Sequence, residues 1–187
     1  MPKKDTHKEL IYTSDEEITL ETIDGSGYSE ALKISNVSNF KGKDLDIYGG
    51  YEDCVDIIRG SNHTFENCVF HCDNSQQGFT IKAGVSDITI KNCVFKGSPS
   101  IGYIVLGQYS DYDFCKEIKT RRINVVNCTF ENEYVHPIIS WNSEDINTDA
   151  RIYKINPIVK SFFFTFRKLY DKVFYGKNGR NEACLKM

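Results

Sequence analysis

The sequence lacks the features that define membrane, secreted and nucleotide-binding proteins. No apolar stretch reaches the roughly 18 residues that a membrane-spanning helix needs. No apolar segment follows the opening Met-Pro-Lys-Lys-Asp, so we expect no secretory signal peptide. The chain contains no phosphate-binding loop, dinucleotide fingerprint, serine elbow or nucleic-acid-binding motif. These absences favour a soluble protein of another class.

Cysteine occurs seven times in 187 residues, which is an odd number in a chain long enough to bury a core. A disulfide framework is typical of small secreted domains with an even number of cysteines. We therefore expect reduced thiols and synthesis in a cytosol.

Charge is distributed unevenly along the chain. The formal net charge is −3, but residues 151–187 carry +7 and residues 1–150 carry −10. An acidic body with a basic tail indicates that the tail contacts an acidic partner. The candidates are the body itself, a membrane surface and a nucleic acid. We divide the chain at this point into a domain of residues 1–150 and a tail of residues 151–187.

One eight-residue motif recurs along the acidic body. It reads apolar, polar, apolar, polar, Asn, Cys, variable, Phe. A looser fourth copy, Leu32-Lys-Ile-Ser-Asn36, leads into Phe40. The three close copies are His63-Thr-Phe-Glu-Asn-Cys-Val-Phe70, Ile88-Thr-Ile-Lys-Asn-Cys-Val-Phe95 and Ile123-Asn-Val-Val-Asn-Cys-Thr-Phe130.

The spacing of the motif predicts a solenoid. Its first half alternates with period two, as a half-buried strand does, and Asn then ends the strand at a turn. The intervals between copies are 31, 25 and 35 residues, and solenoid coils vary in length in this way by insertion at their corners. A second strand-like block lies in each coil, at 54–60, 79–84, 103–107 and 137–141. We therefore predict an all-β protein, a short right-handed parallel β-helix of about five coils with leading strands at its N-terminal end.

In-register stacking of the coils places equivalent side chains over one another. We expect the repeated asparagines to form an amide ladder, the cysteines to line up in the interior and the phenylalanines to form an aromatic stack. The ladder would contain Asn36, Asn67, Asn92 and Asn127, the thiol column Cys68, Cys93 and Cys128, and the stack Phe70, Phe95 and Phe130.

The tail contains a predicted amphipathic helix over residues 158–175. Asn156 suits the N-cap, Pro157 the first turn and Gly176 the stop. The open end of a solenoid needs a cap, and the broad phenylalanine-rich face of this helix would supply one. A membrane-surface helix at 157–175 and a contact in a homo-oligomer are the alternatives.

The Asn-Cys-x-Phe coils resemble the pectate-lyase-like β-helix superfamily over roughly residues 30–145. Within it, Glu52-Asp-Cys-Val-Asp56 is similar to the acidic calcium-binding run of some polysaccharide lyases. Gly78-Phe-Thr-Ile-Lys82 is similar to the strand that carries a catalytic lysine there. The resemblance implies that Glu52, Asp53 and Asp56 bind Ca²⁺ and that Lys82 is the base. In those lyases the preceding coil adds an acid, for which Asp24 and Asp46 are the candidates here.

The chemistry of these residues is consistent with that implied role. Pairing Val55 with Phe79 places Asp56 over Thr80 and brings Lys82 close to the acids on the outer face. Ca²⁺ prefers carboxylate oxygens, and a β-eliminating lyase needs a base beside a cation. Arg59 would hold the substrate carboxylate. A surface ion pair between Asp56 and Lys82 is the structural alternative.

Aromatic residues gather in the later coils. Exposed aromatic rings on a flat β-helix face stack on sugar rings, and long insertions in solenoids tend to carry binding. The insertion 108–120 is the longest departure from the repeat. The predicted ligand-binding residues are Tyr103, Tyr109, Tyr112 and Trp141, with Tyr134 nearby.

Three functional hypotheses follow. The first is a non-catalytic binding or structural module that needs no cofactor and recognises a glycan or a partner. A virion protein fits this description, since it is made in a reducing cytosol and meets polysaccharide without a signal peptide. The second is a Ca²⁺-dependent polyuronate lyase. The third is a membrane-apposed protein that uses the basic helix of its tail.

Overall fold

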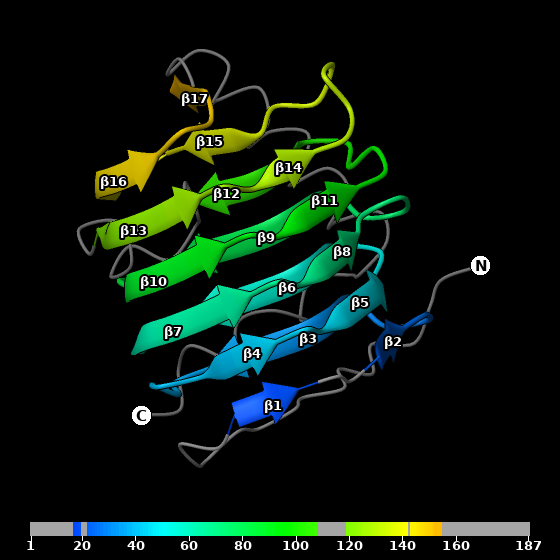
Figure 1. The fold of residues 1–187 in the computed structure, drawn as a ribbon, viewed down its shortest axis with the longest axis horizontal. Coiled ribbons are helices and arrows are strands. Elements are labelled where there is room, and N and C mark those ends of the chain that lie inside the picture. Colours follow the sequence, from blue (N-terminus) through cyan, green and yellow to red (C-terminus); the bar gives the residue numbers. More distant parts are fainter. Residues whose placement is uncertain (1–16, 20–21, 108–118, 142, 155–187) are drawn as a thin grey trace, which may run out of the picture.

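The computed structural model is a parallel β-solenoid built from three sheets (Figure 1). It describes residues 17–19, 22–107, 119–141 and 143–154. Every strand pair in the described residues is parallel, and each coil except the last adds one strand to each sheet, whereas the last coil within the described residues adds a strand to only two of them. The predicted all-β solenoid of about five coils is therefore confirmed.

Successive strands enter the three sheets in rotation, except that no strand of sheet B lies between the last two described strands. Sheet A contains β1 (Glu17–Thr19), β4 (Lys41–Lys43), β7 (Ser61–Glu66), β10 (Ser86–Lys91), β13 (Thr120–Val126) and β16 (Ser143–Thr148). Sheet B contains β2 (Thr22–Gly25), β5 (Asp46–Gly49), β8 (Val69–His71), β11 (Val94–Lys96) and β14 (Thr129–Phe130). Sheet C contains β3 (Glu30–Ser35), β6 (Asp53–Ile58), β9 (Gln77–Lys82), β12 (Gly102–Leu106), β15 (Ile138–Ser140) and β17 (Ile152–Lys154).

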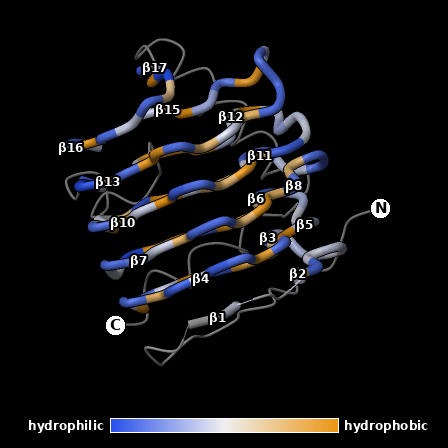
Figure 2. Tube along the Cα trace, viewed as in Figure 1, coloured by the Kyte–Doolittle hydropathy of each residue, from blue (hydrophilic) through white to orange (hydrophobic). Residues whose placement is uncertain are grey.

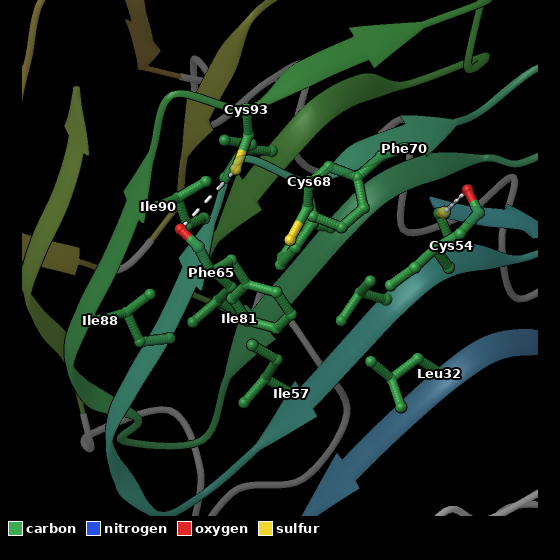
Figure 3. Close-up of a cluster of buried hydrophobic side chains, with 14 of the residues drawn as sticks. Leu32, Cys54, Ile57, Phe65, Cys68, Phe70, Ile81, Ile88, Ile90 and Cys93 are labelled. Atoms are coloured by element: carbon green, nitrogen blue, oxygen red, sulfur yellow. Dashed lines mark hydrogen bonds between the residues drawn. The ribbon is translucent and has the colours of Figure 1, made fainter. Parts of the chain in front are cut away.

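The core fills the space that the three sheets enclose. Strand β10 alternates between buried and half-buried residues along its whole length, as the period-two pattern predicts. Figure 2 shows both hydrophobic and hydrophilic residues along the strands β7, β10 and β13 of sheet A. The inward side chains of all three sheets form one apolar cluster (Figure 3).

The phenylalanine stack runs through the interior beside sheet B. The ring centroids of Phe70 and Phe95 are 4.9 Å apart, and those of Phe95 and Phe130 are 5.0 Å apart with 17° between the planes. In-register pairing of β8, β11 and β14 places these rings directly over one another. The predicted aromatic stack is confirmed.

An asparagine ladder follows the corner between sheets A and B. Asn67, Asn92 and Asn127 all have positive φ values, between 52° and 56°, which asparagine tolerates better than most residues. Asn92 Nδ2 donates to Asn67 Oδ1 at 3.3 Å, and Asn127 Nδ2 donates to Asn92 Oδ1 at 2.7 Å. These three positions form the predicted amide ladder.

The fourth position of the ladder is Asp44, so the prediction of Asn36 was wrong. Asn67 Nδ2 donates to Asp44 Oδ1 at 3.2 Å, whereas Asn36 follows β3 of sheet C at a different corner. The true fourth copy of the motif is 40–47, in which Gly42 and Leu45 replace the usual apolar residue and cysteine. The coil therefore repeats after 23, 25 and 35 residues along the ladder.

Glycines form the corner that follows sheet C, as the sequence predicts. Gly60, Gly84 and Gly107 have φ values of 85°, 80° and 77°, in the left-handed region that favours glycine. At Gly60, an added Cβ would collide with the carbonyl oxygen of Val37 in the preceding coil.

The predicted tail helix lies outside the described residues, so its role as cap, membrane helix or oligomer contact stays a prediction. No helix occurs within the described ranges. In the same ranges, no helix is long and apolar enough to cross a membrane.

Candidate functional site

Three neighbouring strands of sheet C bring the predicted site residues together. Val55 pairs with Phe79 and Asp56 pairs with Thr80, which is the register expected from the sequence. On the other side, Asp56 pairs with Lys33 of β3. The outward positions of β3, β6 and β9 therefore hold a polar cluster.

Asp56 is the centre of this cluster. Its Oδ1 lies 3.0 Å from Lys82 Nζ, and its Oδ2 lies 3.5 Å from Lys33 Nζ. The two lysines converge on the carboxylate from the strands on either side, and Asp56 is only 1% exposed. The predicted proximity of Lys82 to Asp56 is present, but the pair is buried rather than displayed on the surface.

Asp53 and Glu30 complete the cluster. Asp53 is 2% exposed, and its Oδ1 accepts a 2.7 Å hydrogen bond from Thr80 Oγ1. Glu30 lies in the preceding coil, where it pairs with Asp53, and its Oε1 is 3.5 Å from Lys33 Nζ. Ligand atoms of Glu30, Asp53 and Asp56 all lie within 4.8 Å of one another.

The observed acidic trio differs from the predicted one in a single residue. Glu52, predicted as a metal ligand, is buried but does not belong to the trio. The acid from the preceding coil is Glu30, whereas Asp24 accepts a hydrogen bond from Ser26 N and Asp46 pairs with His71. Sequence reasoning missed Glu30 because the copy at 40–47 was not recognised. The true coil length of 23 residues, counted back from Asp53, leads to Glu30.

The environment moves the two aspartate pKa values apart. Burial raises the pKa of Asp56, but the ammonium groups of Lys82 and Lys33 outweigh burial and hold it below its usual range. Burial and the nearby charge of Asp56 raise the pKa of Asp53 well above its usual range. The carboxyl group of Asp53 is therefore easier to protonate than that of Asp56.

Lys33 is held in its charged form. Burial lowers the pKa of Lys33, but the carboxylates of Asp56 and Glu30 outweigh this effect and raise it. The amino groups of Lys33 and Lys82 face the carboxylates of Asp56 and Glu30, and Asp53 accepts a hydrogen bond from Thr80. The cluster satisfies its own charges.

This arrangement does not fit a calcium site. Ca²⁺ takes six to eight oxygen ligands, and here both oxygens of Asp56 already face ammonium groups at 3.0 and 3.5 Å. A divalent cation would have to displace Lys33 and Lys82 from a buried position. The residues therefore form an internally paired ion cluster.

Arg59 lies at a corner of the solenoid. It has a φ of 61°, and its Nη1 donates to Asn36 Oδ1 at 3.3 Å. It follows β6 at the turn into sheet A, and the contact with Asn36 links it to the equivalent turn of the preceding coil. Its predicted role as a substrate clamp stays a prediction.

Tyr103 is not the exposed aromatic residue that the sequence analysis expected, and its role in ligand binding stays a prediction. Its side chain is fully buried because position 103 faces inward, in register with Gly78 of the coil below. The phenol donates to Gly97 O at 2.6 Å and accepts from Asn132 N at 3.0 Å. Tyr103 therefore ties together two corner loops.

Exposed aromatic surface lies at the turn between β14 and β15. Tyr134 is 89% exposed, and the ring of the exposed His136 packs on Tyr153 with centroids 4.1 Å apart. Trp141 is half-buried at another corner, where its backbone N donates to Leu106 O. Tyr109 and Tyr112 lie outside the described residues.

Comparison with known proteins identifies one family. Residues 30–149 match the family model described as the right-handed β-helix region, which covers more than half of the chain. No curated protein matches the sequence.

Proposed function

Since the chain belongs to the family of right-handed β-helix proteins, we propose that it is a non-catalytic module that recognises a glycan through aromatic side chains of its last coils. The β-helix fold in general supports a structural or binding module, and fold alone does not identify a ligand. The exposure of Tyr134, at 89%, is the observation that carries the proposal.

The loop that presents Tyr134 is held in place by hydrogen bonds. Asn132 Oδ1 accepts from Tyr134 N at 2.9 Å, and Asn132 O accepts from Val135 N at 3.1 Å. The buried phenol of Tyr103 anchors the start of the same loop through Asn132 N. A loop backbone that is held in place before binding loses less entropy when a ligand arrives.

The chemistry of this surface suits a sugar. The apolar face of a pyranose stacks on an aromatic ring, and neighbouring polar groups bond its hydroxyls. Tyr134 supplies a ring, and His136, two residues further along the chain, packs its ring on that of Tyr153 of β17. Asn132 Nδ2 donates to Ser98 Oγ at 2.7 Å and links the loop to the preceding coil. Association with a virion, where reduced thiols and polysaccharide meet, is part of the proposal.

We expect Tyr134→Ala to weaken glycan binding about tenfold, which corresponds to about 1.4 kcal/mol. The measurement is binding of the full chain to a panel of immobilised neutral and acidic polysaccharides. Tyr48→Ala is the control, because Tyr48 is a partly exposed tyrosine that contacts the ring of His71, with centroids 6.1 Å apart, and lies coils away on β5. Absence of binding by the wild type, or an equal loss in Tyr48→Ala, would contradict glycan recognition at this loop.

The lyase is the second candidate, and the approach of Glu30, Asp53 and Asp56 within 4.8 Å is the observation in its favour. Because the Nζ atoms of Lys33 and Lys82 already contact the carboxylate oxygens of Asp56, we expect calorimetric titration with Ca²⁺ to show no binding. We likewise expect no unsaturated product from polyuronates. The opposite outcome has two parts: Glu30→Gln weakens calcium binding, and Lys82→Ala abolishes turnover. Together they would contradict the non-catalytic module and support the lyase.

A further inference from the structure

Three cysteines occupy one column in the interior of the solenoid. Cys68, Cys93 and Cys128 each follow a ladder asparagine and precede a strand of sheet B. The strands after them are paired in register, Val94 with Val69 and Val94 with Thr129. Figure 3 shows Cys68 and Cys93 among the buried apolar side chains.

The three thiols point the same way. Each Sγ donates to the carbonyl two residues earlier, at 3.3 Å for Cys68, 3.2 Å for Cys93 and 3.5 Å for Cys128. Each also donates to a carbonyl of the coil below, at 3.6, 3.7 and 3.5 Å. Identical contacts imply parallel side chains, so neighbouring sulfurs follow the strand spacing of about 4.8 Å.

This spacing is unfavourable for a disulfide. A disulfide needs Cβ atoms about 3.8 Å apart and a dihedral angle near 90° about the sulfur–sulfur bond. Parallel side chains on neighbouring strands keep their Cβ atoms at about the strand spacing. The five cysteines of the described residues are all free.

The same spacing matches a two-coordinate soft metal ion. Two metal–sulfur bonds of about 2.3 Å in a line place the sulfurs about 4.6 Å apart. Thiolates favour soft ions such as Cu(I). We propose that the column binds one Cu(I)-like soft monovalent ion between the sulfurs of Cys93 and Cys128.

Cys128 provides the access to this pair. It is half-buried, whereas Cys93 is 1% exposed and Cys68 is fully buried. An ion that enters from solvent therefore meets the sulfur of Cys128 first.

Binding is an exchange of protons for metal, with no change of oxidation state. Each of the two sulfurs loses its S–H proton to solvent and forms one S–metal bond. One monovalent ion and two thiols thus give a bis-thiolate complex of charge −1 and two released protons. The negative charge is placed beside the half-buried end of the column.

The test uses the full chain with Cys115→Ser and Cys184→Ser, so that only the five cysteines of the described residues remain. Anaerobic Cu(I) is added in the presence of a chromophoric Cu(I) chelator, and native mass spectrometry counts the bound ions. We expect one tightly held ion, which Cys93→Ala and Cys128→Val each release to the chelator. Cys68→Ala should retain it, because the proposed pair is intact.

The double variant Cys54→Ala/Cys72→Ala is the matched control. These two cysteines are also buried and their thiols also interact, but they lie outside the column. Retention of the ion in this control supports the proposal. Loss in the control, or retention in Cys128→Val, would overturn it, as would a Cys93–Cys128 disulfide after mild peroxide treatment. Circular dichroism establishes that each variant is folded, and Cys128→Val changes the least buried member of the column. The outcome is independent of glycan binding.

Discussion

Replacing Asp56 by asparagine is expected to lower the free energy of unfolding by about 3–5 kcal/mol at neutral pH, the range found when one partner of a buried ion pair is removed. Asp56 is 1% exposed and faces Lys82 at 3.0 Å and Lys33 at 3.5 Å. Asparagine keeps the shape but removes the negative charge, and two ammonium groups are left without their shared counterion. Urea denaturation followed by circular dichroism measures the change.

Asp53→Asn is the matched control for this prediction. Asp53 lies three residues away on the same strand and is equally buried, but it accepts from Thr80 Oγ1 instead of facing two lysines, and burial raises its pKa. Asparagine at 53 can still accept from Thr80, so we expect little loss of stability or a small gain. Equal losses in the two variants would show that shape, and not charge, holds the cluster together.

The wild-type protein is expected to lose about 3 kcal/mol of stability through His63 alone as the pH falls from about 7 through 4. His63 is fully buried at a position that Ile88 occupies in the next coil. In the described part of the chain, neither ring nitrogen has a hydrogen-bond partner, and burial lowers the pKa of His63 to about 4.

The sign follows from the two pKa values. In the unfolded chain His63 takes up a proton near pH 6.5, whereas the folded protein resists protonation until about pH 4. Between these values the unfolded state binds more protons, so acid favours unfolding. Below about pH 4 the contribution of His63 levels off.

His63→Ile isolates this effect from the titration of carboxylates. Isoleucine is the residue at the equivalent positions 88 and 123, so it suits the column, and it removes a buried polar group that lacks a partner. We expect the variant to be more stable than the wild type at pH 7 and to show the smaller loss in acid. Parallel curves for the two proteins between pH 7 and pH 4 would contradict a buried, neutral His63.

Most of the fold could be predicted because each copy of the motif contains the strand pattern, the turn residue and the interior residues that one coil needs. Period-two alternation defines the strand of sheet A, and asparagine suits the left-handed corner. Phenylalanine and cysteine suit the interior of a stack of equal coils. The confirmed aromatic stack and the ladder of Asn67, Asn92 and Asn127 follow from these local preferences.

The candidate site could be predicted only in part. The register of Asp56 over Thr80 and the approach of Lys82 followed from aligning two strands. Glu30 was missed because one copy of the motif has Gly42, Asp44 and Leu45 in place of the usual apolar residue, asparagine and cysteine. Without that copy, the coil length of 23 residues could not be read from the sequence.

The sequence by itself determined that coils of unequal length stack in register at the repeated motif, because alternation and turn residues are local properties of the chain. Only the tertiary structure decided which outward and inward positions are buried. Asp56 is outward in register yet buried beneath two lysines, and Tyr103 turns inward to anchor two loops. Burial depends on side chains from neighbouring coils and from other sheets. Because these side chains are far apart in the sequence, no single segment predicts which of them come together.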